Sequence, residues 1–345
     1  MHNEAFEITL TDAESALIRQ AFSHIPYMPN GNEEYITALR VAAYSSIPER
    51  ILKILERQRS SNNPLPYVIF NNLPIDEAIY GSPTFSDKGT DFKSANLSEN
   101  VITAFGSVVG EPYSIYFEGQ ELVNNLTPQK DCKRDYTGLG SDVELDFHIE
   151  NAALKFMSED DYSPMGIFFL GLRVDPNSTS PKTRISDARL ALSRLSKEDL
   201  KILCENNFII RVPYRWRGAF AGEKANTELC PLVSGPADFP RISAVFYPDM
   251  VKPVGDRAKE AFMNFYDAIK FVSVSTYLTP GKLLYVDNRF ALHSRDEFCA
   301  TYDENGAPYR WVQRLFVAPN LWNFRTISSI GERVFNPAIP NNFVE

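Results

Sequence analysis

Apolar residues recur at helical spacing in the first third of the chain. The segment 33–59, EEYITALRVAAYSSIPERILKILERQR, has this spacing, and Pro48 is expected to divide it into two helices, because proline lacks the amide hydrogen that a helix interior uses. A further helical segment, 98–109, ends at Gly110, a residue type common just after helix ends. The pattern predicts a mainly helical N-terminal layer over residues 1–110.

Beyond residue 110, short apolar runs rich in β-branched and aromatic residues predict strands. Together with the earlier run PYVIFNNLP, these segments are 121–126, 143–150, 165–174, 208–214, 241–247, 282–286 and 311–317. Two helical insertions separate them: residues 186–207, where Ser196 and Asp199 resemble a capping pair, and residues 255–271. Many short strands with helices outside them predict a mixed α/β, β-rich fold, with a β-sandwich or jelly-roll core over residues 111–345 that is decorated with helices.

The composition fits an ordinary globular protein and argues against several classes. The 345 residues are 44% hydrophobic and 23% charged, which suits a single elaborated domain, 1–345, with a full core. A net charge of −9 argues against a nucleic-acid partner, because a phosphate-binding surface needs a basic stripe. The chain has no run of about 18 apolar residues, and its first residues, MHNEAFEITLTDAE, lack the pattern of a secretory leader. The four cysteines are scattered without a CxxC pair, so we expect reduced thiols, a cytoplasmic location and no membrane partner.

The segment VELDFHIE, residues 143–150, alternates strictly between apolar and polar side chains. In a strand, residues two apart project to the same side, so His148 and Glu150 would present an imidazole and a carboxylate next to each other. This pair suits two adjacent coordination positions of one metal ion. An HxE pattern also arises by chance, and the alternative is two ordinary polar strand residues.

Histidine is scarce in this chain, which shortens the search for a third ligand: there are four. His2 lies at the terminus, and His24 precedes a proline-rich turn, where a surface role is expected. His293 follows the strand-like KLLYVDN in a stretch, DNRFALHSRDEF, where polar groups interrupt an apolar background. A strand followed by a histidine-containing turn makes His293 the candidate that completes a 2-His-1-carboxylate triad, the ligand set of non-haem iron(II) oxygenases.

Two arginines four residues apart follow His293 in the segment RWVQR, residues 310–314. Guanidinium groups bind carboxylates through two parallel hydrogen bonds, so this segment could hold two ligands that carry carboxylates. The alternative is a pair of exposed arginines on an edge strand, which the pattern alone leaves open.

Taken together, these residues resemble the clavaminate synthase-like group of iron(II)/2-oxoglutarate oxygenases, which includes hydroxylases of free arginine, asparagine and lysine. The resemblance covers most of the chain, from YVIFNNLP through FEGQELVNNLTP, FHIENA and GLRVDPNSTSPKT to the His293 segment and RWVQR. The order of HxE, a late histidine and RWxQR is specific, although each part alone is not. The resemblance implies a double-stranded β-helix (jelly-roll) core and an enzyme that uses Fe(II), 2-oxoglutarate and O2.

The resemblance also implies roles for the iron and cosubstrate residues. His148, Glu150 and His293 would be the iron ligands and the catalytic centre. Arg310 resembles the arginine that binds the C5 carboxylate of 2-oxoglutarate, and Thr183 resembles the hydroxyl that helps it. The implied reaction couples decarboxylation of 2-oxoglutarate, to succinate and CO2, with hydroxylation of an unactivated carbon. Halogenating relatives need a small residue where this chain has Glu150, so halogenation is disfavoured.

For the substrate, the resemblance implies a site for a free amino acid. Arg314 is similar to the residue that meets the α-carboxylate in family members. Glu118 resembles a residue that takes the α-amino group, and Ser141 is a looser candidate for the same zwitterion site. The two helical insertions could cover the mouth of this site or build the interface of a homo-oligomer.

The distal end of the substrate is the least constrained feature. Relatives that recognise a guanidine group carry a pair of acids after an arginine, whereas RISAVFYPDM places Ser243 and Val245 there, with only Asp249 nearby. Arginine is therefore disfavoured, and the prediction is hydroxylation of a free L-amino acid, lysine first, at C3 or C4. The alternatives are another substrate such as arginine, citrulline or asparagine, desaturation at the same centre, and a non-catalytic β-sandwich binding protein.

Overall fold

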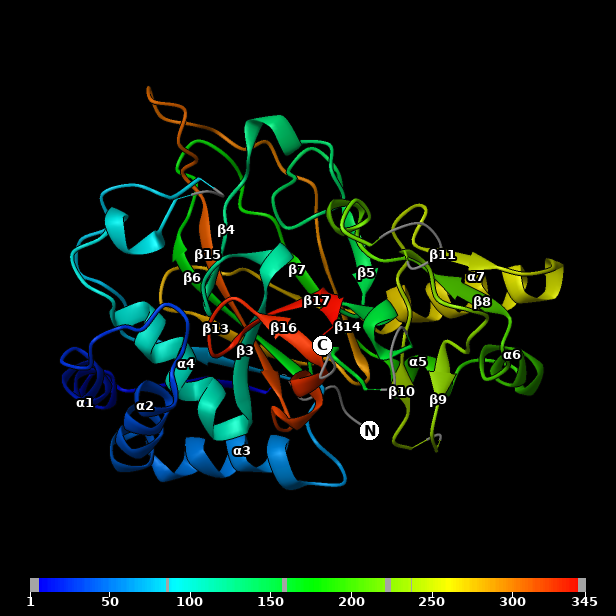
Figure 1. Ribbon diagram of the computed structural model, residues 1–345, viewed down its shortest axis with the longest axis horizontal. Helices are drawn as coiled ribbons and strands as arrows, with labels where there is room; N and C mark the ends of the chain where they lie inside the picture. Colours follow the sequence, from blue (N-terminus) through cyan, green and yellow to red (C-terminus); the bar gives the residue numbers. More distant parts are fainter. Residues whose placement is uncertain (1–5, 85–86, 157–159, 221–224, 237, 341–345) are drawn as a thin grey trace, which may run out of the picture.

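Two β-sheets face each other at the centre of the molecule, and helices cover them from outside (Figure 1). The computed structural model describes residues 6–84, 87–156, 160–220, 225–236 and 238–340, so His2 lies outside the described residues. The larger sheet has the strand order β1-β2-β13-β6-β15-β3-β17-β16, and β4 pairs with β15. Its strands are β1 (Glu7–Thr9), β2 (Tyr67–Asn71), β3 (Glu111–Ile115), β4 (Asn124–Leu126), β6 (Gly166–Arg173), β13 (Leu283–Asp287), β15 (Trp311–Ala318), β16 (Ile327–Ser329) and β17 (Val334–Pro340).

The smaller sheet is antiparallel and has the order β12-β7-β14-β5. Its strands are β5 (Leu145–His148), β7 (Thr183–Asp187), β12 (Val274–Thr276) and β14 (Ala291–Arg295). Apolar residues of both sheets, such as Ile185 and Leu292 on one side and Ile167 and Phe316 on the other, belong to one buried cluster. The main core therefore lies between the sheets.

The N-terminal helices form a layer on the other face of the larger sheet. They are α1 (Asp12–Phe22), α2 (Glu33–Ser46), α3 (Glu49–Ser60) and α4 (Leu97–Val109). Phe105 of α4 packs in one cluster with Phe168 and Leu315 of the sheet. The break before α3 at Pro48 and the end of α4 before Gly110 agree with the prediction. Helix α1 was not predicted, although its capping box is a sequence signal for it.

The helical insertions pack behind the smaller sheet. Residues 186–207 form two short helices, α5 (Ala188–Leu192) and α6 (Lys197–Leu203), and the second insertion is α7 (Asp256–Val272). The strands predicted at 208–214 and 241–247 are shorter, because only β8 (Phe208–Ile210) and β10 (Arg241–Ile242) form ladders there, with β11 (Val251–Pro253) and β9 (Val233–Ser234). Both ladders are separate two-stranded sheets, and α5 and α7 contact β7 of the smaller sheet.

The helix cap predicted at Ser196 is present, because the Asp199 amide donates to Ser196 Oγ at 3.0 Å. Ser196→Ala should lower the free energy of unfolding by about 1 kcal/mol, since an orphan helix amide loses its acceptor. Urea denaturation measures this. In the control, Ser45→Ala, the hydroxyl only donates to the Val41 carbonyl within α2, so no loss is expected. An equal loss in both variants would contradict the capping role.

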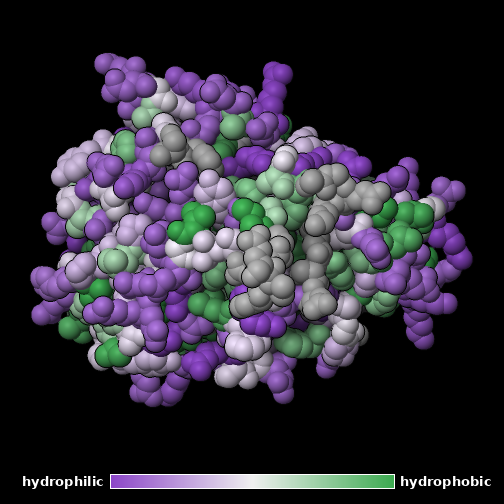
Figure 2. Space-filling view, in the orientation of Figure 1, coloured by the Kyte–Doolittle hydropathy of each residue, from purple (hydrophilic) through white to green (hydrophobic). Residues whose placement is uncertain are grey.

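The surface carries no extended apolar band in the view of Figure 2, where hydrophilic residues predominate and apolar ones form small groups. None of the helices in the described part of the chain is long and apolar enough to cross a membrane.

Candidate functional site

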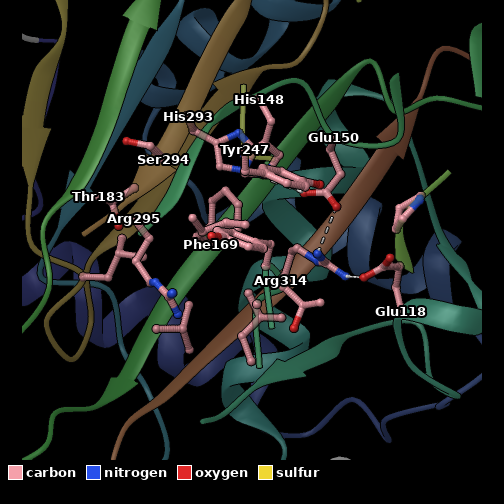
Figure 3. Close-up of a pocket in the computed structure, with 18 of the residues that line it drawn as sticks. Glu118, His148, Glu150, Phe169, Thr183, Tyr247, His293, Ser294, Arg295 and Arg314 are labelled. Atoms are coloured by element: carbon pink, nitrogen blue, oxygen red, sulfur yellow. Dashed lines mark hydrogen bonds and ion pairs between the residues drawn. The ribbon is translucent and has the colours of Figure 1, made fainter. Parts of the chain in front are cut away.

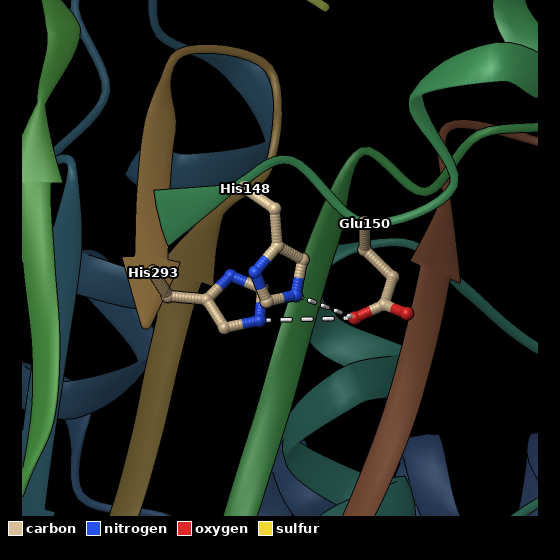
Figure 4. A group of neighbouring side chains, drawn as sticks. All are labelled: His148, Glu150 and His293. Carbon is tan, nitrogen blue, oxygen red and sulfur yellow. Dashed lines mark ion pairs between the residues drawn. The ribbon is translucent and has the colours of Figure 1, made fainter. Parts of the chain in front are cut away.

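His148, Glu150 and His293 lie together between the two sheets (Figures 3 and 4). His148 is the last residue of β5 and lies opposite His293 of the neighbouring strand β14. Nε2 of His148 is 3.9 Å from Glu150 Oε2, and Nε2 of His293 is 3.7 Å from the same oxygen. One ligand atom from each residue lies within 4.8 Å of the others, and all three residues are buried. The spacing is that of a group that can close around one metal ion.

Two details of this group differ from the prediction. His293 lies within a strand and not in a turn, so cross-strand pairing with His148 brings the two imidazoles together. Glu150 lies beyond the end of β5, in the turn that follows it. The buried side chain of Asn288 fixes this turn: it accepts from the Glu150 amide at 2.8 Å and donates to the Glu150 carbonyl at 3.1 Å.

The protonation of the group suits a cation. Nδ1 of His148 lies 2.8 Å from the Asp146 carbonyl oxygen, so this nitrogen donates and Nε2 keeps its lone pair toward Glu150. Burial lowers the pKa of His148 to about 4 and that of His293 well below its usual range. Burial raises the pKa of Glu150 to about 7, and a bound cation would reverse this shift. Two neutral imidazoles and a carboxylate form the 2-His-1-carboxylate donor set.

The RWVQR segment runs into β15, a strand with neighbours on both sides. Strand alternation directs Arg310 and Arg314 toward the cavity between the sheets. The alternate residues face the helical layer, where Trp311 Nε1 donates to Asn125 Oδ1 at 2.9 Å and Gln313 Nε2 donates to Glu99 Oε1 at 2.8 Å. Arg310 and Arg314 are 9% and 4% exposed, so the alternative of exposed arginines on an edge strand is wrong.

Arg314 lies between two acids at one end of the cavity (Figure 3). Its Nη2 donates to Glu118 Oε2 at 2.7 Å, and its Nη1 donates to Glu150 Oε1 at 3.3 Å. Burial would raise the pKa of Glu118, but the charges of Arg314 and Arg215 outweigh it and hold the pKa below its usual value. The structure therefore brings Arg314 and Glu118 together as a charged pair next to Glu150.

Arg310 and Thr183 line the cavity with Arg295. Arg310 forms none of the ion pairs in the described part of the chain, and its guanidinium lies over the Phe298 ring, 5.3 Å from the centroid. Burial, with no acid opposing it, lowers the pKa of Arg310 to about 10. A buried guanidinium without a carboxylate partner is a site for an anionic ligand.

Sequence reasoning missed Arg295 and Arg215. Arg295 lies on β14 opposite Thr183. It donates to the carbonyls of Gly140 and Val143, the latter at 2.8 Å, and so stabilises the loop before β5. Arg215 lies in a short 3-10 helix, η5 (Tyr214–Trp216), and its Nη2 is 3.4 Å from Glu118 Oε2. Arg295 is at the end of a strand and Arg215 is in a short helix, and neither belongs to a recognisable motif. Their positive charge was the one signal in the sequence that could have pointed to them.

Ser141 is not brought to this cavity with the other predicted residues. Its buried hydroxyl donates to Asp142 Oδ1 at 2.7 Å, and its carbonyl accepts from the Phe298 amide. These contacts stabilise the loop, and the proposed contact with an amino acid stays a prediction without support from the geometry.

One cavity connects these groups. It encloses about 780 Å³ of empty space, a figure that includes open solvent at its mouth. Apolar side chains of Leu126, Leu145, Phe169 and Leu278 form walls between the charged ends. The lining therefore offers two imidazoles and a carboxylate for a metal ion, and buried guanidinium groups for carboxylates.

Comparison with known proteins identifies the family. The model of the taurine catabolism dioxygenase TauD, TfdA family matches residues 88–316. The chain belongs to the TauD/TfdA dioxygenase family. Membership makes the protein an enzyme, so the alternative of a non-catalytic β-sandwich binding protein is wrong.

Curated proteins similar to this TauD/TfdA dioxygenase act on different amino acids. The L-asparagine oxygenase of Streptomyces coelicolor is 25% identical over 326 residues, covering 93% of this chain and 92% of that protein. The L-lysine 4-hydroxylase of Niastella koreensis is 24% identical over 337 residues, covering 92% and 85%. Both relatives are named as enzymes that oxidise an amino acid, and their substrates differ.

Two solved structures share the fold of this TauD/TfdA dioxygenase. Asparagine oxygenase in complex with Fe(II), 2S,3S-3-hydroxyasparagine and succinate superposes with a TM-score of 0.81 at 24% identity, covering 96% of this chain and 99% of that chain. The non-heme iron oxygenase OrfP in complex with Fe and alpha-ketoglutaric acid has a TM-score of 0.78 at 21% identity, covering 96% and 100%.

Proposed function

We propose that this protein is an Fe(II)- and 2-oxoglutarate-dependent hydroxylase of a free L-amino acid. One observation carries the proposal: a single cavity places the two-histidine, one-carboxylate group beside two arginines. One is buried and forms no ion pair with any described residue, and the other is paired with a carboxylate. The first group suits a metal ion, the buried arginine suits a dicarboxylate, and the arginine–carboxylate pair suits a zwitterion. The two facing sheets would then be the halves of a double-stranded β-helix, and the whole chain one oxygenase domain.

The residues present fit a bound iron ion. His148, Glu150 and His293 would hold it, because their Nε2 atoms and a carboxylate oxygen converge and the Asp146 carbonyl fixes the tautomer of His148. When bound, iron supplies the redox chemistry with O2 and 2-oxoglutarate. The protein's share is to orient two organic molecules and to keep bulk water out of an apolar-walled cavity.

Arg314 and Glu118 provide a site for the α-carboxylate and the α-ammonium group. The carboxylate accepts from the guanidinium and the ammonium donates to Glu118, so each charge of the zwitterion meets its opposite. Arg314 is 3.3 Å from Glu150, so an amino acid held here has the first carbons of its side chain next to the metal-holding group. This placement supports attack at C3 or C4.

Arg310 is proposed to hold the distal carboxylate of 2-oxoglutarate, with Thr183 beside it. Arg310→Met should raise the KM for 2-oxoglutarate roughly 10- to 100-fold, because a hydrogen-bonded charge contact is lost. Arg310→Lys should give a smaller rise, since lysine keeps the charge without the fork. Initial rates of succinate formation against 2-oxoglutarate concentration measure this.

Arg184→Met is the matched control for Arg310, because Arg184 is 39% exposed and pairs with Asp296. Its KM for 2-oxoglutarate should be unchanged. A variant at Arg310 that alters only the KM for the amino acid would contradict the assignment.

The overall proposal is tested with the purified protein, Fe(II), 2-oxoglutarate, O2 and a panel of free amino acids. We expect one class of amino acid to stimulate succinate release and to gain one oxygen atom. A product lacking two hydrogens would show desaturation at the same centre. Absence of stimulated turnover with every amino acid would contradict the proposal.

A further inference from the structure

We infer that the substrate's side chain ends in a carboxamide or a carboxylate and not in a cation, and that Arg215 is a specificity-determining residue for it. The inference rests on the proposed function and names the substrate class of the same cavity. It departs from lysine, the first expectation from the sequence.

The first argument is the lack of an acid for a distal cation. Within the described part of the chain, the carboxyl groups that line the cavity are Glu118 and Glu150. Glu150 belongs to the metal-holding group, and Glu118 is bound by Arg314 at 2.7 Å and by Arg215 at 3.4 Å. Among the described lining residues, an ε-ammonium or guanidinium group would find no free counter-charge, and an unpaired buried cation is costly.

The second argument concerns Asp249, the acid that follows Ser243 and Val245 in the sequence. Asp249 does not line the cavity. It pairs with Arg211, and it lies 3.0 Å from Arg217 Nη1. Ser243 and Val245 are buried and carry no charge. Asp249 therefore forms ion pairs with two arginines outside the cavity and stabilises the chain just after Arg215.

The third argument is the placement of Arg215 itself. Trp216, fully buried beside it, anchors the short 3-10 helix, and the Arg215 side chain is 23% exposed at the cavity. Its guanidinium borders Glu118, the proposed site of the α-ammonium group, so it lies within reach of a short side chain. Guanidinium N–H groups donate to carboxylate and carboxamide oxygens and repel ammonium groups.

The charge of the lining agrees with this preference. Its described charged residues are four arginines, Arg215, Arg295, Arg310 and Arg314, against the two acids Glu118 and Glu150. The stacked rings of Tyr136 and Tyr247, with centroids 6.0 Å apart, also line the cavity. Aromatic faces can attract an ammonium group, but the excess of guanidinium charge in the same lining opposes it.

The test compares kcat/KM for glutamine, glutamate, asparagine and aspartate with kcat/KM for lysine and ornithine. In the parent enzyme, the best amide or acid should exceed lysine by roughly tenfold or more. Arg215→Met should reduce this ratio, and Arg215→Glu should invert it in favour of lysine. The ratio is the informative quantity because Arg215 also contacts Glu118. A disturbed Glu118 would lower kcat/KM for all amino acids alike and would leave the ratio unchanged.

Lys201→Glu, at a 77% exposed position on α6, introduces the same change of net charge and should leave the ratio unchanged. Calorimetric titration of the anaerobic enzyme, loaded with Mn(II) and 2-oxoglutarate, should give the same order of affinities without turnover. Preference for lysine in the parent enzyme, or an unchanged ratio in Arg215→Glu, overturns this inference and leaves the proposed function standing. Failure of every amino acid to bind or react overturns both.

Discussion

His293→Ala is expected to bind a divalent cation at least about 100-fold more weakly than the parent protein and to lose measurable turnover. Even residues that only orient metal ligands change affinity about 10- to 100-fold, and His293 offers Nε2 itself, 3.7 Å from Glu150 Oε2. His148 and Glu150 would remain, but two ligands cannot replace the facial set of three. Anaerobic titration with Fe(II) or Mn(II) measures the affinity, and succinate formation measures turnover.

The matched control for this prediction is His24→Ala, which removes an exposed histidine after α1. Its metal affinity and turnover should equal those of the parent. The far-UV circular dichroism of both variants should also match the parent, because neither side chain anchors a helix. Unchanged metal affinity in His293→Ala would show that the triad is not the metal site.

The sequence pattern predicted the long apolar strands, such as β6 and β15, and the helix ends that local chemistry determines, but it missed shorter elements that depend on distant partners. The break at Pro48 and the end of α4 at Gly110 follow from backbone chemistry at those residues. The segment that forms β14 was predicted to be a turn, because its apolar residues are few and polar residues flank them. It forms a strand through pairing with β5 and β7. Glu150 was placed on the strand, but Asn288, 138 residues away, holds it in a turn.

The candidate site shows the same division. The spacing of Arg310 and Arg314 predicted a segment that could hold two ligands with carboxylates, and both side chains line the cavity. Glu118 and Thr183 came from family resemblance, and the structure places both in the same lining. The role of Arg215 could not be predicted from the sequence, because its position depends on the short helix η5 and on the burial of Trp216. Neither feature follows from a helical or strand periodicity in the sequence.

Arg314→Met is expected to lower the free energy of unfolding by about 3–5 kcal/mol, because the buried Glu150 loses its arginine partner and the buried Glu118 loses the closer of its two. Arg314 donates to Glu118, Glu150 and Asn124, and its side chain is 5% exposed. The variant should also lose binding of the amino acid, since the proposed α-carboxylate site is gone. Urea denaturation of the metal-free protein gives the first quantity, and calorimetric titration gives the second.

A second substitution separates charge from packing in the Arg314 prediction. Adding Glu118→Gln to Arg314→Met removes a buried charge that only the more distant Arg215 still opposes. The double variant should therefore regain part of the lost stability, while amino-acid binding stays absent. Arg184→Met, which breaks the partly exposed pair with Asp296, should cost about 0–1 kcal/mol. If Arg314→Met cost no more than Arg184→Met, the Arg314–Glu118 pair would not be a buried charge pair.

Because binding of a divalent cation favours the folded state, metal should raise the stability of Arg314→Met and of the parent, since both keep the triad.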